Sequence, residues 1–324
     1  MSSLMNLINK DVLRVLTPPD REPQWHEDLE RFLKGDRKLT RDNLGEAAVE
    51  AIQRLLIFLG YSTTRRGSFA IDGDFGRGTN RGIAQYQFER GLRSALDLEV
   101  LSYDCSWQNA HTRLLEQPLP KIDLVTIRSL LTTARRNIKQ QQVMCGDFGI
   151  ALEHLDMLHT RRYHTCREIR YLYGDAARNA AGLVAEDSGA VHPRWILAII
   201  KQETGGIIRP RFEQHIFSRL IRKTPDDSFT HHRFSAMSLG LGQILGLNHA
   251  RVGATSPEAM YYSSMAEQVY FVARYLSGHE SAANAEPGER DFRAIARFYN
   301  GPGYEKHDYH ASLQRWFNEF RTLI

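Results

Sequence analysis

Cysteines and long apolar runs are the features that this sequence lacks most clearly. Only three cysteines occur in 324 residues, Cys105, Cys145 and Cys166, and none stands in a C-x-x-C pair. This excludes a disulfide framework and a zinc site built on such pairs, so we expect reduced, inert thiols. No apolar run approaches the ~20 residues that a helix needs to span a bilayer. The sequence therefore predicts a protein that does not insert into membranes.

Signals for secretion, repeats and strands are scarce as well. Charged and polar residues interrupt every apolar run in the N-terminal stretch MSSLMNLINKDVLRVLTPPD, so it lacks the apolar core of a signal peptide. We therefore expect synthesis in the host cytoplasm without such a peptide. No internal repeat, heptad pattern or biased tract is present, which excludes solenoids and coiled coils. Strand patterns are almost absent from the C-terminal half, and the chain is expected to be mainly α-helical.

The charge balance is only weakly basic. Lys and Arg number 42 against 38 Asp and Glu, which gives a formal net charge of +4. Such a charge favours contact with an anionic polymer, either nucleic acid or an acidic cell envelope. The basic residues are spread along the chain, and no helix-turn-helix or zinc-finger pattern accompanies them. We therefore expect no nucleic-acid partner.

Helical periodicity dominates what the sequence does contain. In EAAVEAIQRLLIFLGY, apolar residues recur on one helical face and Gly60 is placed to end the helix. A second helix is predicted after the loop SFAIDGDFGRG, with Thr79 as its N-cap, and a third over residues 124–139 with Asp123 as its N-cap. These segments predict a small bundle of three helices.

The glycine-rich loop between the first two helices, IDGDFGRGT, fits none of the common ion or nucleotide sites. It lacks the glycine and the bidentate glutamate of an EF-hand, and its spacing misses both the P-loop and the dinucleotide pattern. The loop resembles that of the peptidoglycan-binding domain, in which a helix ending in L-G-Y precedes I-D-G-x-F-G-x-x-T. The resemblance implies that residues 41–140 bind the cell wall, with these loop positions as candidates: Asp72, Asp74, Phe75 and Thr79.

One helix of the C-terminal half ends on an acidic residue. The segment HPRWILAIIKQETGG predicts a helix that begins near Pro193, buries an apolar stripe and has Glu203 at its carboxyl end. A carboxylate there meets the negative end of the helix dipole in a partly desolvated setting, and both effects favour the neutral acid. A general acid needs a carboxyl group that keeps its proton near neutral pH. Glu203 is therefore the leading candidate for acid catalysis.

Three short motifs follow one another in this half: KQETGG from position 201, SLGLGQILG from 238 and ARFYNGPGY from 296. Together and in this order they resemble the catalytic core of lysozyme-like glycosidases that act on peptidoglycan, including lytic transglycosylases. The segment RPRFEQHIFSRL is similar to K-P-x-x-x-F-E-x-H-x-F-x-R-L of the N-acetylmuramidase family, found in phage endolysins and some secreted effectors. The resemblance covers roughly residues 175 to 320.

This resemblance implies a mainly α protein, with a three-helix peptidoglycan-binding bundle followed by a lysozyme-like helical catalytic domain. The expected order is an N-terminal extension over 1–40, the binding domain over 41–140, a linker helix over 141–174 and the catalytic domain over 175–324. Matching motif by motif, Glu203 is implied as the catalytic acid. The other matched positions are Glu213 and His215 of the F-E-x-H segment, Gln243 in the saccharide cleft, and Tyr299 and Asn300 of the third motif.

The sequence departs from the family pattern in places and leaves some roles open. Thr204 stands where serine is usual, and Leu239 replaces a common tryptophan. Glu213 is either a second catalytic group or a structural partner of nearby basic residues. Asp226 and Asp227 are further candidates for the second carboxylate, and Tyr304 is a candidate for sugar binding. His231 and His232 lack metal-ligand spacing and are expected in a solvated loop, and no metal or cofactor is expected.

The predicted reaction is cleavage of the β-1,4 bond between N-acetylmuramic acid and N-acetylglucosamine in periplasmic peptidoglycan, as in an endolysin-type muramidase. Three alternatives stay open: a lytic transglycosylase that forms a 1,6-anhydro product, an injected antibacterial muramidase effector, and a non-catalytic wall-binding protein. We expect a monomer whose partner is peptidoglycan. A holin would assist the release of an endolysin, whereas an effector would be accompanied by an immunity protein.

Overall fold

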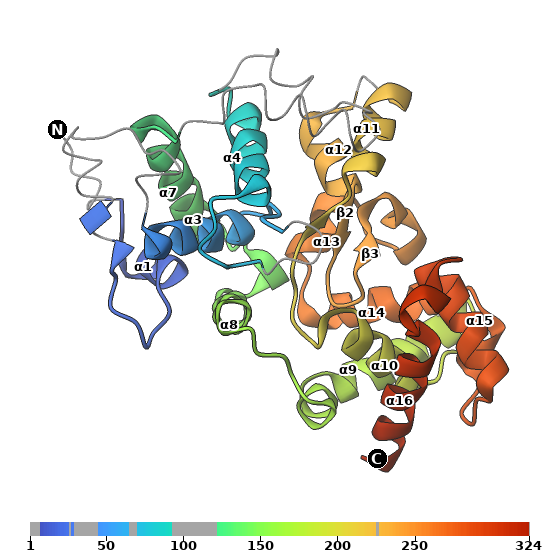
Figure 1. Ribbon diagram of the computed structural model, residues 1–324. Helices are drawn as coiled ribbons and strands as arrows, with labels where there is room; N and C mark the ends of the chain where they lie inside the picture. Colours follow the sequence, from blue (N-terminus) through green and yellow to red (C-terminus); the bar gives the residue numbers. More distant parts are fainter. Residues whose placement is uncertain are drawn as a thin grey trace. The chain divides into compact units, whose positions relative to one another are not determined.

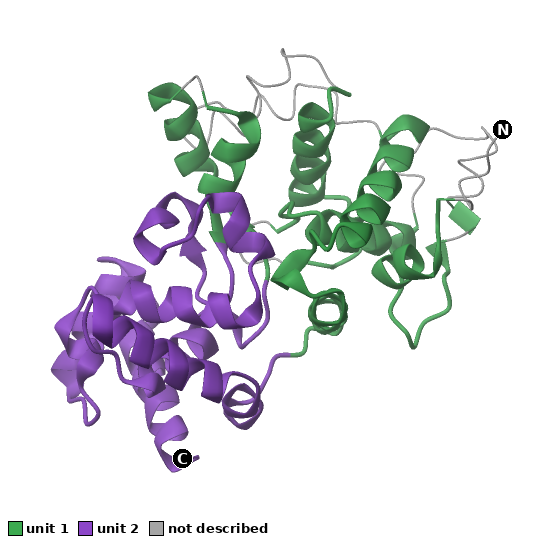
Figure 2. Cartoon of the chain, turned by 180° about the vertical axis from the view of Figure 1, so that it is seen from behind, with its two compact units in different colours: residues 1–162, 209–238 green, residues 163–208, 239–324 purple. Residues whose placement is uncertain are grey.

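The chain is mainly α-helical, as predicted (Figure 1). The computed structural model describes residues 7–25, 27–28, 45–64, 70–92, 122–224 and 227–323. It divides into two compact units (Figure 2): unit 1 comprises residues 1–162 and 209–238, and unit 2 comprises residues 163–208 and 239–324. Within the described ranges, none of the helices combines the length and the apolar character needed to cross a bilayer.

Unit 1 contains the helices of the predicted bundle together with a segment from later in the chain. The principal helices in its described residues are α1 Lys10–Leu16, α3 Glu46–Phe58, α4 Arg77–Glu89, α7 Leu124–Lys139, α8 Phe148–Thr160, α11 Gln214–Lys223 and α12 Phe229–Ser235. The apolar face predicted for α3 is buried, with exposures of 0% to 3% at Ala48, Ile52, Leu55, Leu56 and Leu59. Helix α7 begins as predicted, since Asp123 Oδ1 accepts a hydrogen bond of 2.7 Å from the Thr126 amide.

The start predicted for the second helix was wrong by a few residues. Helix α4 begins at Arg77 with Gly76 as its N-cap, so Thr79 lies inside the first turn. Its hydroxyl donates to the Asp74 carbonyl at 3.1 Å. In the first turn of α4, a Cβ at Gly78 would lie only 1.9 Å from the Thr63 carbonyl oxygen, so only glycine allows this close approach of the two backbones.

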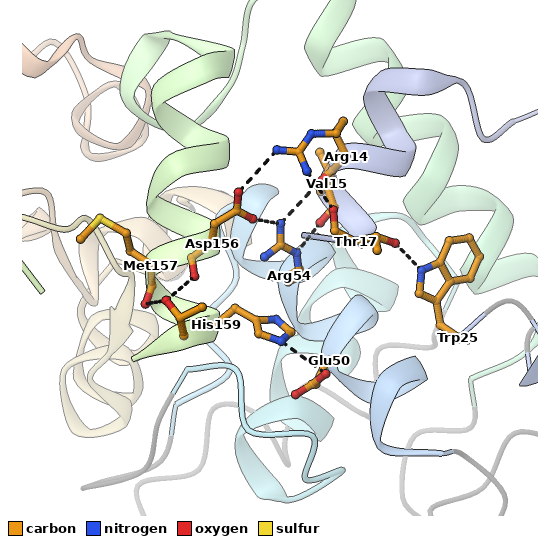
Figure 3. A network of polar contacts seen from close by, with 10 residues as sticks. Arg14, Val15, Thr17, Trp25, Glu50, Arg54, Asp156, Met157 and His159 are labelled. Atoms are coloured by element: carbon orange, nitrogen blue, oxygen red, sulfur yellow. Dashed lines mark hydrogen bonds and ion pairs between the residues drawn. The ribbon is translucent and has the colours of Figure 1, made fainter. Parts of the chain in front are cut away.

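A buried arginine joins α1, α3 and α8 of unit 1 (Figure 3). The Arg54 side chain is fully buried, and it donates to the Val15 carbonyl at 2.7 Å and to Asp156 Oδ1 at 2.7 Å. Asp156 Oδ2 also forms an ion pair with Arg14 Nη2 at 3.4 Å. Since a buried guanidinium is tolerated only when it is paired and hydrogen-bonded, this network fixes α1 and α8 against the peptidoglycan-binding bundle predicted from the sequence.

His159 lies beside this network and gives unit 1 an expected pH dependence. Its Nε2 is 3.5 Å from Glu50 Oε2, and burial, with the positive charge of Arg54 as the next cause, lowers the pKa of His159 to about 4. The unfolded chain binds a proton near the ordinary histidine pKa of ~6.5, whereas the folded chain does not. The free energy of unfolding should therefore decrease by about 2 to 3 kcal/mol as the pH falls from about 6.5 to about 4.

The variant His159→Gln tests this dependence in urea denaturation at several pH values. Gln does not titrate, so this acid limb should largely disappear in the variant. Burial raises the pKa of Glu50, so the folded state binds the proton of Glu50 more strongly than the unfolded state. Protonation of Glu50 therefore increases the free energy of unfolding as the pH falls, opposite to the effect of His159. The difference between the two proteins isolates His159, and parallel curves for both would contradict the assignment.

Unit 2 is built on helices that pack around α10. The principal helices in its described residues are α9 Cys166–Asp187, α10 Pro193–Thr204, α13 Pro257–Tyr262, α14 Met265–Leu276, α15 Glu289–Asn300 and α16 Tyr309–Thr322. Helix α10 packs against α9, α14 and α16. Trp195 is fully buried, and its ring centroid lies 5.0 Å from that of Phe292 and 4.7 Å from that of Phe317. The apolar stripe predicted for α10 thus forms the centre of this unit.

Short strands occur where the sequence predicts almost none. They are β1 Arg211–Phe212, β2 Met237–Leu239 and β3 Ile244–Leu245, in the order β1-β2-β3. β1 and β2 are antiparallel, with Arg211 opposite Ser238 and Phe212 opposite Met237. Strands of two or three residues are too short for an alternating pattern to be recognised.

The compact units do not follow the predicted domain boundaries throughout. Residues 209–238 fall within the predicted catalytic domain, yet they belong to unit 1 (Figure 2). Arg233 of α12 holds this segment: its side chain is 2% exposed, and its Nε donates to Glu89 Oε1 of α4 at 2.6 Å. The guanidinium also donates to the Gly60 carbonyl and lies 4.1 Å from the centroid of the Tyr61 ring. The segment is therefore attached to the predicted peptidoglycan-binding bundle by a buried ion pair.

The cysteines within the described residues agree with the expectation of inert thiols. Cys145 and Cys166 are free and buried. Burial is the first cause that raises the pKa of each thiol, and the thiolate is the reactive form. Cys105 lies outside the described residues.

Candidate active site

Glu203 lies at the end of α10, as the sequence predicts. The helix has Pro193 in its first turn and ends at Thr204, and Gly205 follows in a left-handed conformation with φ of 60°. A Cβ at position 205 would be strained and would lie 2.9 Å from Tyr163 Cβ, so glycine is required there. Glu203 thus occupies the last turn of a buried helix and is half-buried itself.

A tyrosine from the C-terminal helix contacts this carboxylate. Tyr309 is 6% exposed, and its hydroxyl donates to Glu203 Oε1 at 2.5 Å. Burial, followed by the negative charge of Glu203 and this hydrogen bond, raises the pKa of Tyr309 well above its ordinary value. The phenol therefore keeps its proton across the physiological range and holds one carboxylate oxygen in a fixed position. No local signal in the sequence connects Tyr309 with a residue 106 positions earlier.

We expect Tyr309→Phe to lower kcat on peptidoglycan about tenfold or more, because the ring stays in place while the hydrogen bond that orients Glu203 is lost. Steady-state kinetics on solubilised glycan strands measures this change. Tyr86→Phe is the matched control, since Tyr86 is another buried tyrosine, on α4, whose hydroxyl pairs with Ser129 at 2.7 Å. Equal kcat values for Tyr309→Phe and Tyr86→Phe would show that the contact with Glu203 has no catalytic consequence.

The loop G-L-G-Q at residues 240–243 closes against the same helix end. Thr204 Oγ1 donates to the Leu241 carbonyl at 2.9 Å, so the threonine that departs from the family pattern connects the first two motifs. A Cβ at Gly242 would lie 2.5 Å from Tyr299 Oη. The loop therefore needs glycine at 242 to let Tyr299 donate to the Gly242 carbonyl, which it does at 2.8 Å.

Tyr299 is the residue of the third motif that interacts electrostatically with Glu203. This residue lies in the last turn of α15. Burial is the first cause that raises the pKa of Tyr299 well above its ordinary value, and the charge of Glu203 is the second. Gln243 adopts a left-handed conformation with φ of 48°, and its Nε2 donates to the Gly240 carbonyl at 3.3 Å. The structure thus brings together the three motifs that the sequence singled out: Glu203, the loop 240–243 and Tyr299, with Tyr309 added.

Comparison with known families agrees with this cluster. The sequence model of the family described as N-acetylmuramidase matches residues 230–321. The chain carries an N-acetylmuramidase domain. A second model, described as a putative peptidoglycan binding domain, matches residues 45–94. No curated protein and no solved structure matches the chain. A muramidase domain implies a glycoside hydrolase that acts on peptidoglycan.

The muramidase match contains some of the predicted site residues and not others. Gln243, Tyr299, Asn300 and Tyr304 lie within it, whereas Glu203 precedes it. Asn300 is exposed at the end of α15. Tyr304 is 9% exposed, and its hydroxyl donates to Glu305 Oε1 at 3.0 Å. The roles of Asn300 and Tyr304 in sugar binding remain predictions.

Glu213 and His215 of the F-E-x-H segment belong to unit 1. Glu213 precedes α11 as its N-cap residue, and its amide donates to the Ala236 carbonyl at 2.8 Å. Its carboxylate pairs with Arg211 Nε at 2.9 Å. His215 is exposed in the first turn of α11. The ion pair with Arg211 is the structural role that the sequence left open for Glu213.

A half-buried arginine of the peptidoglycan-binding domain also acts on Glu213. Arg81 lies on α4, and its Nη2 donates to the Thr64 carbonyl at 2.7 Å. Its Cζ lies 5.1 Å from the centroid of the Phe212 ring. Burial lowers the pKa of Arg81 to about 10, and the charge of Glu213 acts in the opposite direction. Arg81 therefore stays charged at neutral pH, and Glu213 lies in the field of a cation from the wall-binding domain.

The remaining candidates in this segment differ from expectation. Asp227 is exposed, and Asp226 lies outside the described residues. The prediction of a solvated loop at His231 and His232 was wrong, because both lie in α12 and His232 is only 3% exposed. Nowhere in the described ranges do three or more His, Cys, Asp or Glu residues form a group that could hold a metal ion.

The predicted wall-binding loop is organised around Gln53, a buried residue of α3. Gln53 Nε2 donates to Asp72 Oδ1 at 2.8 Å and to Thr79 Oγ1 at 2.9 Å, and its Oε1 accepts from the Asp72 amide at 3.0 Å. Phe75 is 5% exposed, and Asp74 is exposed. Asp72 and Thr79 thus shape the loop, while Asp74 offers a carboxylate to the solvent. Contact of any of the four with peptidoglycan stays a prediction.

Proposed function

We propose that this protein is a peptidoglycan hydrolase that cleaves the β-1,4 bond between N-acetylmuramic acid and N-acetylglucosamine, with Glu203 as general acid. The observation that carries the proposal is the hydrogen bond from the buried Tyr309 to Glu203 at 2.5 Å, at the end of a buried helix. The neighbouring loop and Tyr299 lie within the muramidase match. A half-buried carboxyl group oriented by a phenol is suited to deliver a proton to a bound sugar.

In the proposed mechanism Glu203 transfers its proton to the glycosidic oxygen as the bond to the muramic acid breaks. Positive charge then develops on the sugar as in an oxocarbenium ion. Tyr309 holds Glu203 in position through the change of protonation state, since its own proton does not leave. Gln243 and Asn300 would hydrogen-bond the substrate, and Tyr299 would keep the loop of Gln243 in place through the Gly242 carbonyl.

The group that completes the reaction is proposed to be Glu213. A separation of roughly 5 Å between the two carboxyl groups would mean a nucleophile, and one of roughly 6.5 to 9.5 Å would mean a base that activates water. Without a second carboxylate, the 6-hydroxyl of the muramic acid can attack and give a 1,6-anhydro end, as in lytic transglycosylases. The further candidates are Asp227, which is exposed, and Asp226, which lies outside the described residues.

Mass spectrometry of the fragments released from purified peptidoglycan tests the reaction. Fragments ending in a reducing N-acetylmuramic acid are expected. A 1,6-anhydro end would replace the hydrolase by a lytic transglycosylase, and an end in N-acetylglucosamine would exclude both. If no soluble fragment forms, the protein binds the wall without cleaving it.

We further propose that the protein acts as an endolysin on periplasmic peptidoglycan. The combination of a muramidase domain with a peptidoglycan-binding domain supports this role, because the binding domain raises the local concentration of enzyme on an immobile polymer. Expression in the cytoplasm of a test bacterium should leave cells intact until a holin is co-expressed. Cells protected by the product of a neighbouring gene would instead identify an injected effector with an immunity protein.

A further inference from the structure

An exposed arginine of unit 2 lies on two aromatic rings. Arg251, in the short helix η4 Ala250–Val252, has its Cζ 4.0 Å from the centroid of the Tyr275 ring and 5.0 Å from that of Phe298. A Cβ at Gly278 would lie 2.8 Å from Arg251 Nη2. The glycine therefore leaves the room in which the guanidinium lies against the rings.

The Arg251 guanidinium has N–H donors available for a ligand. Among the described residues, no carboxylate or carbonyl forms an ion pair or hydrogen bond with the Arg251 side chain, and its contacts are those with the two rings. Stacking on aromatic rings fixes a planar guanidinium while its N–H groups remain directed outward. Such an arginine can bind a carboxylate or phosphate with two parallel hydrogen bonds at little entropic cost.

This arginine is connected with the candidate active site by aromatic contacts. The Tyr275 ring contacts both the Arg251 guanidinium and the Tyr299 ring, with a centroid distance of 5.1 Å between the two tyrosine rings. Tyr299 in turn donates to Gly242 in the loop of Gln243. A glycan strand bound at this loop would therefore bring its substituents within the neighbourhood of Arg251.

We propose that Arg251 binds a carboxylate of the peptide stem of peptidoglycan, an inference that rests on the proposed function. The sugars of the glycan strand are uncharged, and the lactyl carboxyl group of muramic acid is consumed in the amide bond to the peptide. The free carboxylates of the stem peptide are thus the anions closest to the bond that is cleaved. Arg251 would select strands that carry peptides and would contribute to substrate affinity rather than to the chemical step.

Binding of soluble fragments tests the proposal apart from catalysis. Titration calorimetry in a Glu203→Gln background would compare a disaccharide bearing a stem peptide with the same disaccharide after removal of the peptide by an amidase. Arg251→Met keeps the apolar contact with the rings and removes the charge. We expect it to weaken binding of the peptide-bearing fragment about tenfold, as for the loss of one charge-assisted contact, and to leave binding of the stripped fragment unchanged.

Further variants separate charge from geometry. Arg297→Met is the matched control, since Arg297 is an exposed arginine on α15 and its replacement should leave both affinities unchanged. Gly278→Ala keeps the charge but displaces the guanidinium, and an intermediate loss is expected. Equal affinities of the Arg251→Met and reference proteins for the peptide-bearing fragment would overturn the proposal, as would an equal loss with both fragments. Absence of cleavage by the wild type would overturn the proposed function instead, since the binding comparison does not depend on turnover.

Discussion

Glu203→Gln is expected to lower kcat/KM on peptidoglycan by a factor of about 10³ or more, because an amide of the same shape cannot donate the proton that the leaving oxygen requires. The fold should be kept, since Tyr309 can donate to the amide oxygen as it does to the carboxylate. A loss of this size corresponds to about 4 kcal/mol of transition-state stabilisation. Release of soluble fragments from labelled peptidoglycan, measured over several orders of magnitude in enzyme concentration, gives the ratio.

A surface carboxylate provides the control for this experiment. Glu258 is exposed in the first turn of α13, and Glu258→Gln should stay within twofold of the wild type. Glu213→Gln separates the two interpretations of the second carboxylate. A loss of about a hundredfold would support a direct part in the reaction, whereas a loss of a few fold would leave Glu213 as the partner of Arg211. Activity of Glu203→Gln within tenfold of the wild type would remove Glu203 from the catalytic role.

Local sequence pattern was sufficient to predict the helix that carries Glu203. The apolar stripe of α10, the proline at its start and the glycine after its end are features of adjacent residues, and the structure confirms them. Tyr309 could not be assigned in this way, because its hydrogen bond to Glu203 depends on how α16 packs against α10. Thr204 is similar: its bond to the Leu241 carbonyl explains a departure from the family pattern only once the loop is in place.

The segment 209–238 shows a second limit of local pattern. The stretch with two histidines and Arg233 is polar, and polar residues are usually solvated. In the structure His232 and Arg233 are 3% and 2% exposed, and the acidic partner of Arg233 is Glu89 on α4, which lies 144 residues earlier in the chain. A charged residue is buried only when a partner compensates for its desolvation, and a partner this distant leaves no periodic signal. The membership of this segment in unit 1 therefore required the tertiary structure.

Arg233→Met is expected to lower the free energy of unfolding by about 3 to 5 kcal/mol, since it leaves Glu89 buried without its cationic partner. Both side chains are nearly inaccessible, with exposures of 2% and 8%, and the ion pair measures 2.6 Å. Glu89 would keep the hydrogen bond from the Tyr61 hydroxyl, which compensates for part of the lost interaction. Urea denaturation followed by circular dichroism measures the change, and hydrogen exchange of residues 229–235 shows whether α12 loosens locally.

A double-mutant cycle distinguishes the ion pair from packing. Glu89→Leu alone should destabilise by a similar amount, and Arg233→Met with Glu89→Leu should cost at least about 1 kcal/mol less than the sum of the two. Arg211→Met is the control, because Arg211 and Glu213 form a pair on the same segment in which Arg211 is 59% exposed, and such pairs contribute less than about 1 kcal/mol. Additive losses would mean that Arg233 acts through its contacts with the rings of Tyr61 and Phe234, whose centroids lie 4.1 Å and 4.2 Å from its Cζ, rather than through Glu89. Coupled losses would mean that the ion pair between Arg233 and Glu89 holds the segment 209–238 against α4. Because this segment carries Glu213, a substitution on α4 would then affect the candidate second carboxylate.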